Sequence, residues 1–432
     1  LAFLLSCGGG GGGSTSGVVV GDGVVLGGSS GGDGTGGDGS SGSASGGGDG
    51  STSTAGNGSG DGSGVGSGGT GVSTADAGTS VGSVDGMGSI IVGGVRYDID
   101  QLDKLDPLQW MLEDATKMQI GMTIAVTGPV DAAFTQGVAR RVVSGAELRG
   151  PVTLPADGAE SSFEILGNKV SFDEGTVWGS NLLGPSSLTA GKNVQVWALP
   201  ASPGTLRATR IETAAVTAPL VTGRVKQLDS TAKTFALGDL IIDYAGLEAN
   251  SLANDAIVRV RADDLPVGDR LRAKRIDGWY AVPSQKGTPV QLEGLITGLL
   301  SPDSFSVLDV VVDASNAQVP VGQKSWLADG VKVVVSGTLS SNGVLVASMV
   351  KVRHLPGMGA LPSHTLIGAV GAYGSPADFL VQGNKVDASA PGVIFTNGSV
   401  SDLGNGKRVT VQGARVVNDV LMATEVTFMS GN

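Results

Sequence analysis

The fold is decided by residues 403–426, which read LGNGKRVTVQGARVVNDVLMATEV. Their frame is Leu-x-x-Gly-x-x-Val-x-Val followed by Leu-x-Ala-x-x-Val, an alternation typical of half-buried strands. Four further copies precede it, and the alanines that mark the five copies are Ala139, Ala208, Ala273, Ala347 and Ala423. A period of 65 to 76 residues is too long for a solenoid unit and suits a small domain. The sequence therefore predicts five tandem β domains.

Each repeat also contains a leading strand and a hairpin ahead of this frame. In the later copies the leading strands begin at Leu148, Val221, Leu292 and Leu366, and the hairpins begin at Phe163, Phe235, Phe305 and Phe379. The first hairpin is residues 87–98, with Gly93 and Gly94 at its turn. Three strands before a variable connection and two after it are the layout of the OB-fold, a partly open Greek-key barrel. We therefore expect an all-β chain of five OB-like, five-stranded barrels.

The connection between the third and fourth strands is expected to differ between repeats. In the first repeat Asp106 and Pro107 resemble a helix start. Apolar residues follow at helical spacing, namely Leu108, Met111, Leu112, Ala115 and Met118. This pattern predicts a helix over residues 107–117. The other connections are shorter and more polar, so we expect at most one helical turn in each.

Two positions of the frame are predicted to have structural roles. The glycine of Leu-x-x-Gly is expected to turn the chain at a positive φ. Asp255 replaces it in the third repeat, and aspartate is one of the few residues that tolerate that conformation. The alanine of Leu-x-Ala is expected to face the barrel interior, where a small side chain fits.

The first 95 residues differ in composition from the rest of the chain. They carry more than half of the 73 glycines and seven aspartates, with no lysine, arginine or glutamate. Such a segment cannot bury enough apolar surface to offset its backbone entropy. We therefore predict a disordered Gly/Ser-rich tether over residues 7–86. The repeats are then expected at 87–144, 145–214, 215–285, 286–360 and 361–432, each with its own core.

The chain opens with an apolar run that ends at Cys7. Residues 4–7, Leu-Leu-Ser-Cys, are similar to a bacterial lipobox, and such a run before cysteine is typical of the end of a signal peptide. The resemblance implies cleavage after residues 1–6, lipidation of Cys7 and anchoring in a membrane. Because Gly8 rather than aspartate follows, it implies the outer membrane of a Gram-negative bacterium, with the array periplasmic or surface-exposed. The alternative is a chance cysteine at the end of a hydrophobic stretch.

Composition and motifs disfavour several classes of function. The single cysteine excludes an internal disulfide framework and a cysteine-based metal site. The net charge of −12 disfavours nucleic acid as a partner. No catalytic triad, paired-acid cleft, phosphate-cradling loop or dinucleotide motif stands out, so we expect neither an enzyme nor a cofactor. His354 and His364 have no carboxylate near them in the sequence, and we expect no metal site.

Outward-facing residues of repeats 2 and 3 form the candidate binding surface. Trp197 is expected to point away from its barrel, because Val194 and Val196 on the same strand point inward. A lone outward tryptophan is either a stacking platform for a sugar ring or a contact with the next domain. The arginines on these repeats are Arg207, Arg210, Arg259, Arg261, Arg272 and Arg275. They form either a positive track for phosphates or uronates, or a solvated face paired with nearby acids.

The repeats resemble a known bacterial family. The resemblance is carried by residues 88–98, GSIIVGGVRYD, and by the Gly-x-x-Val-x-Val and Leu-x-Ala-x-x-Val frames that follow. Across residues 84–428 the chain is similar to the family catalogued as domain of unknown function 5666. The resemblance implies tandem small β-barrels, often behind a lipoprotein signal and a glycine-rich tether. Because that family has no established activity, the resemblance implies no catalytic residues.

The sequence leaves two hypotheses for the function of the protein. The first is a non-enzymatic cell-envelope lipoprotein that displays a string of barrels for scaffolding, adhesion or extracellular assembly. The second is a module that binds an acidic glycan or other polyanion on repeats 2 and 3, through Trp197 and the six arginines. Exposure of those residues on one face of several barrels would favour binding. Their burial between barrels would favour the scaffold.

Overall fold

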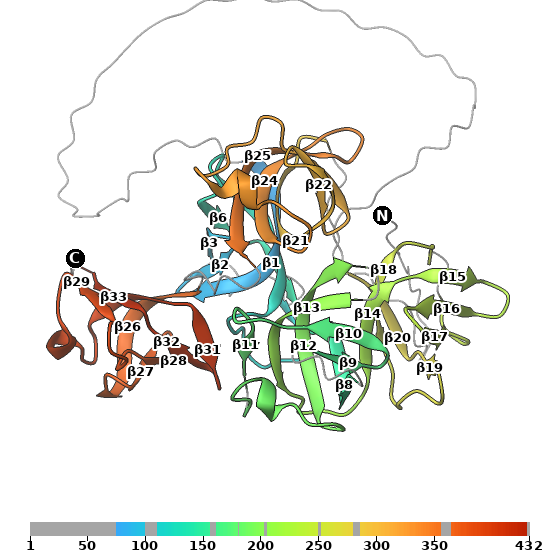
Figure 1. Ribbon diagram of the computed structural model, residues 1–432, viewed down its shortest axis with the longest axis horizontal. Helices are drawn as coiled ribbons and strands as arrows, with labels where there is room; N and C mark the ends of the chain where they lie inside the picture. Colours follow the sequence, from blue (N-terminus) through green and yellow to red (C-terminus); the bar gives the residue numbers. More distant parts are fainter. Residues whose placement is uncertain are drawn as a thin grey trace, which may run out of the picture.

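A computed structural model describes residues 75–99, 110–155, 161–179, 181–202, 205–248, 252–279, 286–355 and 364–429. Across these ranges the chain is built of β-strands gathered into small barrels (Figure 1). The helical elements there are three short 3-10 turns, η3 (Pro185–Ser187), η4 (Gln323–Trp326) and η5 (Val400–Asp402). The all-β class and the short connections of the later repeats are confirmed. In this part of the chain no helix has the length and apolar character needed to cross a membrane.

The strands follow the five predicted repeats. Repeat 1 contains β1 (Ala75–Met87), β2 (Ile90–Val92), β3 (Val95–Asp98), β4 (Trp110–Leu112), β5 (Thr123–Val130), β6 (Gln136–Val138) and β7 (Arg141–Ser144). Repeat 2 contains β8 (Leu148–Thr153), β9 (Ser162–Ile165), β10 (Asn168–Ser171), β11 (Val177–Trp178), β12 (Asn193–Ser202) and β13 (Thr205–Thr213). Repeat 3 contains β14 (Leu220–Arg224), β15 (Lys226–Asp229), β16 (Thr234–Leu237), β17 (Leu240–Asp243), β18 (Ile257–Arg261), β19 (Arg270–Arg272) and β20 (Arg275–Gly278).

Repeats 4 and 5 complete the array. Repeat 4 contains β21 (Pro289–Ser301), β22 (Ser304–Val307), β23 (Val310–Asp313), β24 (Lys332–Leu339) and β25 (Leu345–His354). Repeat 5 contains β26 (His364–Ser375), β27 (Asp378–Val381), β28 (Asn384–Asp387), β29 (Ile394–Thr396), β30 (Arg408–Gly413), β31 (Arg415–Val417), β32 (Val420–Met422) and β33 (Glu425–Phe428).

The repeats arrange their strands in a common order. In repeat 4, β21 pairs with β22, β22 with β23, β23 with β25, β25 with β24, and β24 with β21 again. The β23–β25 pair is parallel, and the corresponding parallel pairs elsewhere are β3–β6, β10–β13, β17–β19 and β28–β32. A circuit of first, second, third, fifth and fourth strands is a closed five-stranded barrel, as the OB-like layout predicts.

The frame residues have the conformations that the sequence predicts. The turn residues Gly121, Gly191, Asp255, Gly330 and Gly406 all have left-handed φ angles, from 71° at Asp255 to 85° at Gly121. The five frame alanines are all buried, and the hairpin phenylalanines Phe163, Phe235, Phe305 and Phe379 fill the barrel cores. The turn residue and the alanine of the frame therefore have structural roles within each barrel.

The predicted helix over residues 107–117 is wrong where the structure describes it, from Trp110 onward. Residues 110–112 form β4, which pairs in parallel with β7. The segment turns at Asp114, whose φ of 67° is left-handed. The carboxylates of Glu113 and Asp114 then reach arginines of repeats 2 and 3, and these long-range ion pairs override the local helix signals.

The predicted tether extends too far toward the barrels. Residues 75–87 form β1, which pairs antiparallel with β5 and parallel with both β21 of repeat 4 and β26 of repeat 5. Its glycines permit these approaches, since a Cβ on Gly86 would overlap the carbonyl oxygen of Thr365. The rest of the predicted tether, with Cys7, lies outside the described residues.

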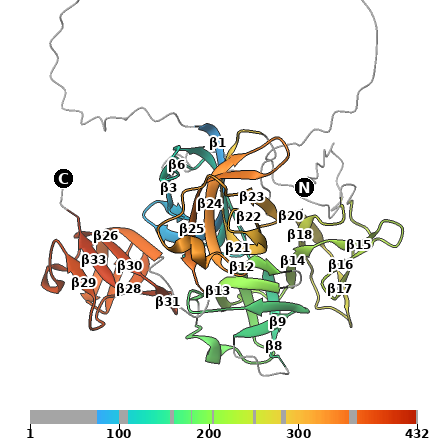
Figure 2. The same cartoon turned by 45° about the horizontal axis from the view of Figure 1, so that its top comes forward.

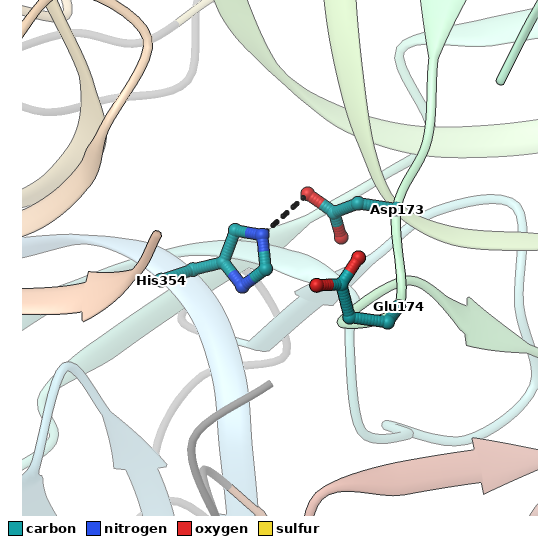
Figure 3. A group of neighbouring side chains, drawn as sticks. All are labelled: Asp173, Glu174 and His354. Carbon is teal, nitrogen blue, oxygen red and sulfur yellow. Dashed lines mark ion pairs between the residues drawn. The ribbon is translucent and has the colours of Figure 1, made fainter. Parts of the chain in front are cut away.

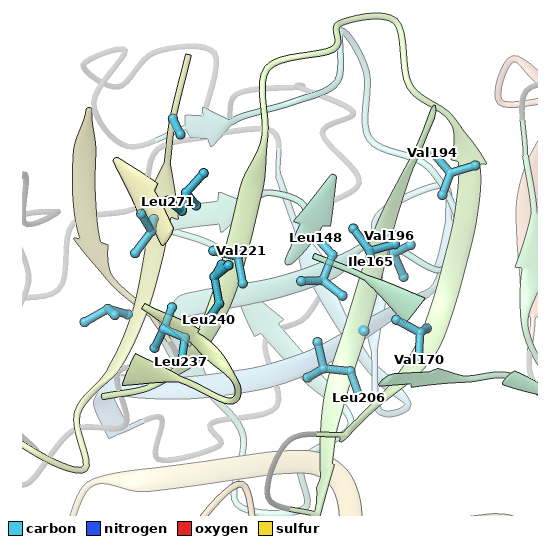
Figure 4. Packing of buried hydrophobic residues seen from close by; sticks show 14 of the residues in the cluster. Leu148, Ile165, Val170, Val194, Val196, Leu206, Val221, Leu237, Leu240 and Leu271 are labelled. Carbon is cyan, nitrogen blue, oxygen red and sulfur yellow. The ribbon is translucent and has the colours of Figure 1, made fainter. Parts of the chain in front are cut away.

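The prediction of five separate cores is wrong for repeats 2 and 3. Repeats 2 and 3 share one hydrophobic cluster, in which Leu148 and Val221 are paired across strands β8 and β14 (Figure 4). The clusters of repeats 1, 4 and 5 each include side chains from elsewhere: Trp197 joins repeat 1, Leu199 joins repeat 4 and Ile120 joins repeat 5. The barrels therefore pack on one another, and Figure 2 shows them gathered around one centre rather than strung in a line.

Candidate functional site

Trp197 is buried at the junction of repeats 1, 2 and 5. It lies on β12 and points away from its own barrel, as predicted, but it is 0% exposed because repeat 1 covers it. The guanidinium of Arg210 lies over its ring, 5.9 Å from the centroid. Arg210 is itself 1% exposed and pairs with Glu212 at 2.7 Å and with Asp419 of repeat 5 at 2.6 Å. Of the two interpretations of Trp197 that the sequence leaves open, its burial excludes the exposed stacking platform and fits the contact between domains.

A cluster of charges joins repeat 1 to repeats 2 and 3. We call it the arginine cluster, and its members are Arg149, Arg259, Arg261, Arg275, Glu113 and Asp114. Asp114 pairs with Arg149 and Arg261, each at 2.8 Å. Glu113 pairs with Arg261 at 2.6 Å, with Arg275 at 3.2 Å and with Arg259. Burial opposes ionisation of Asp114, but hydrogen bonding from Arg261 and the charges of the arginines lower its pKa to about 2.

Trp279 extends the arginine cluster toward repeat 2. The guanidinium of Arg259 stacks on its ring, 3.9 Å from the centroid. The indole Nε1 donates a hydrogen bond to buried Glu147 at 2.8 Å. Glu147 also accepts hydrogen bonds from the hydroxyl of Thr123 at 2.8 Å and from the N–H of Ala198 at 2.7 Å. Glu147 thus links residues of repeats 1, 2 and 3 through one carboxylate.

The other predicted binding residues are divided between ion pairs and the surface. Arg207 pairs with Asp173 of its own repeat at 2.5 Å. Arg275 pairs with Asp277 at 2.8 Å in addition to Glu113. Arg272, on β19, is exposed. The seven predicted residues therefore do not line one accessible track, because Trp197, Arg210 and Arg259 are buried between barrels.

A second cluster, which the sequence does not reveal, surrounds a partly open cavity of about 40 Å³. We call it the histidine cavity. Its lining comes from repeats 1, 2, 4 and 5 and includes Ser83, Asp85, Asp173, Lys332, Arg353, His354 and His364. Nε2 of His354 lies 3.2 Å from Oδ2 of Asp173. No carboxylate lies near either histidine in the sequence, but the fold brings Asp173 of repeat 2 against His354 of repeat 4.

An ion pair and a hydrogen bond join repeats 1 and 4 beside the histidine cavity. Asp85 of β1 pairs with Arg353 of β25 at 2.8 Å. Buried Glu293 of β21 pairs with Lys332 and accepts a hydrogen bond from the hydroxyl of Ser83 at 2.9 Å. Burial raises the pKa of Asp85 to about 6, although the charge of Arg353 opposes the shift. These contacts hold β1 against repeat 4.

His364 makes this part of the molecule sensitive to acid. Burial lowers its pKa to about 3, and the charges of Lys332 and Arg353 act in the same direction while Glu293 opposes them. Histidine in the unfolded chain has a pKa near 6.5, so between about pH 6.5 and pH 3 the unfolded state binds a proton that the folded state does not. His364 therefore lowers the stability of the folded protein as the pH drops through this range. Asp85 acts in the opposite sense, because its raised pKa makes the folded state bind a proton below about pH 6.

When the pH drops from about 7 to about 4.5, we expect the free energy of unfolding to fall less in His364→Gln than in the parent protein. The reason is that the variant has no buried imidazole to charge. Urea unfolding at both pH values measures the two losses. Asp85 is present in both proteins, so its opposite contribution cancels from the comparison. Equal losses would contradict the prediction.

One edge of the histidine cavity groups three side chains able to bind a metal ion. One oxygen each of Asp173 and Glu174 and one ring nitrogen of His354 all lie within 4.8 Å of one another. Figure 3 shows the imidazole facing both carboxylates. Asp173 is held in place by Arg207 and by the N–H of Gly175, which donates to its Oδ1 at 2.9 Å.

These features define the class of protein: a tandem array of OB-like barrels packed around a shared first repeat. A comparison with known protein families identifies the repeated domain. Residues 149–212, 293–351 and 367–427 match the family described as Domain of unknown function (DUF5666). The family model therefore matches repeats 2, 4 and 5 in tandem, and for these three repeats the resemblance seen in the sequence is confirmed. No curated protein is significantly similar to the chain.

Proposed function

We propose that this chain is a non-enzymatic cell-envelope lipoprotein that presents its barrels as one packed scaffold for adhesion or extracellular assembly. The observation that supports this most is the burial of Trp197, Arg210 and Arg259 between repeats. Tryptophan and arginine are the residue types that most often carry recognition at exposed sites. Here they hold barrels together, which favours a structural role.

The charged interfaces suit a scaffold whose repeats keep fixed positions. A buried ion pair adds little net stability compared with apolar packing, but leaving one partner unpaired costs about 3–5 kcal/mol. Any rearrangement that separates the partners while one of them stays buried therefore carries a large penalty. The barrels then present their outer surfaces in one defined geometry, as an assembly platform requires.

A partner screen tests this function. The intact chain is immobilised and exposed to solubilised bacterial envelope and, separately, to an array of acidic glycans. We expect envelope proteins to be retained and no acidic glycan to bind. Glycan binding that both salt and Arg272→Ala weaken would instead support the polyanion-binding alternative on repeats 2 and 3, because Arg272 is the exposed member of the arginine set.

The anchoring part of the proposal predicts that Cys7 carries lipid. Its support is the Leu-Leu-Ser-Cys run at residues 4–7, with a glycine-rich segment directly after it. Expressed behind a complete signal peptide in a Gram-negative host, the chain should incorporate labelled fatty acid and partition into detergent, whereas Cys7→Ser should do neither. The contrast should be large, because acyl chains contribute about 0.8 kcal/mol per buried CH₂. A Cys7→Ser protein that still incorporates fatty acid would overturn the anchor.

A further inference from the structure

The group formed by Asp173, Glu174 and His354 offers ligand types that zinc accepts. An imidazole nitrogen with carboxylate oxygens is a common zinc ligand set, and three protein ligands with one open position are typical of sites that keep a water molecule. The histidine cavity beside the group, with a volume of about 40 Å³, has room for that water.

The position of His354 suits a metal ligand as well as the ion pair that it forms with Asp173. The side chain is buried, with 6% of the residue exposed, and neither ring nitrogen makes a well-directed hydrogen bond within the described part of the chain. Nevertheless Nε2 approaches Oδ2 of Asp173 to 3.2 Å. Neighbouring ligand atoms of a tetrahedral zinc ion lie about 3.4 Å apart and point at the ion instead of at each other.

The ion pair of Arg207 with Asp173 is compatible with a metal ligand. A carboxylate has about four lone-pair positions, so Asp173 can accept from Arg207 and from Gly175 and still present one position to an ion. Ligating carboxylates in metal sites are usually hydrogen-bonded in this way, which fixes their orientation. Glu174 is exposed, and one of its carboxylate oxygens lies within 4.8 Å of the ligand atoms of Asp173 and His354.

We propose that Asp173, Glu174 and His354 bind one zinc ion that joins repeat 2 to repeat 4. The two carboxylates follow β10 of repeat 2, and His354 is the last residue of β25 of repeat 4. Because the ligands come from different repeats, the ion stabilises the packed arrangement of the array and not a single barrel. This inference does not depend on the proposed scaffold function.

Zinc binding is measured on the full chain carrying Cys7→Ser, because that substitution removes the one thiol that would compete for the ion. Equilibrium dialysis at micromolar zinc should give one ion per chain. Glu174→Gln and His354→Ala should each weaken binding by more than about 10-fold, since even a residue that only supports a ligand contributes 10- to 100-fold. Zinc should also raise the melting temperature of the parent and not that of the variants.

His364→Gln is the matched control, because His364 lines the same cavity without belonging to the group, and this variant should bind zinc as the parent does. Glu174→Gln keeps the test valid if His354→Ala fails to fold, since Glu174 is at the surface. Calcium should bind more weakly than zinc, because it prefers sites built from oxygen ligands alone. No zinc binding by the parent, or equal binding by Glu174→Gln, would overturn the proposal.

Discussion

Replacing Asp114 by alanine is expected to destabilise the packed array by about 3–5 kcal/mol, because it removes one partner from a buried network of charges. The side chain of Asp114 is 4% exposed and pairs with Arg149 and Arg261. The guanidinium of Arg149 is buried as well, and after the substitution it would lose its carboxylate while still held away from water. The effect should be a loss of contact between repeat 1 and repeats 2 and 3.

Urea unfolding followed by tryptophan fluorescence measures this loss, since Trp197 and Trp279 lie at the affected interfaces. The matched control is Asp263→Ala, whose side chain is 63% exposed and pairs with exposed Lys274. That substitution should change the free energy of unfolding by no more than about 0.5 kcal/mol, because surface ion pairs contribute little to stability. Should both variants prove equally stable, the arginine cluster does not hold repeat 1 in place.

Substituting Gly86 by alanine should release repeat 5 from repeat 1. Gly86 faces Thr365 across the parallel pair of β1 and β26, and an added Cβ would overlap the Thr365 carbonyl oxygen. A backbone atom cannot rotate away as a side chain can, so the two strands must separate. Overpacking costs about 1–3 kcal/mol where side chains yield, and at this contact the strand pairing itself should be lost.

Chemical cross-linking between repeats 1 and 5 and amide exchange of β26 measure the release, since unpaired strands exchange faster. The control is Gly371→Ala on the same strand β26, where an added Cβ would meet nothing within 4 Å. That variant should behave as the parent does. Retention of the β1–β26 pairing in Gly86→Ala would contradict the role given to this glycine.

The internal structure of each barrel could be predicted because it depends on local patterns. The positive φ of Gly406, and even of Asp255, follows from the frame, and the buried alanines follow from strand alternation. The same alternation placed Trp197 on the outer face of its strand. It could not say what covers that face, because period-two patterning describes a strand relative to its own barrel and contains no information about the next one.

The candidate sites could not be predicted because their members come from distant segments. Glu113 and Asp114 lie within a stretch that has the spacing of a helix, and the arginines that bind them belong to repeats 2 and 3. Asp173 and His354 lie in different repeats, so the sequence shows two histidines without a carboxylate. The glycines of β1 resemble a flexible linker for a similar reason, since a close neighbouring strand and a disordered segment both favour residues without a side chain.

Strand β1 also determines how the molecule would respond to a pulling force. It pairs with β5, β21 and β26, so a single segment contacts repeats 1, 4 and 5. Hydrogen bonds in an antiparallel ladder lie perpendicular to the strands, and tension applied at Ala75 along β1 would load the β1–β5 ladder in shear, with many bonds resisting together. A partner gripping repeat 4 or repeat 5 would therefore be mechanically coupled to whatever holds the N-terminal end of the chain, without the intervening barrels having to unfold in turn.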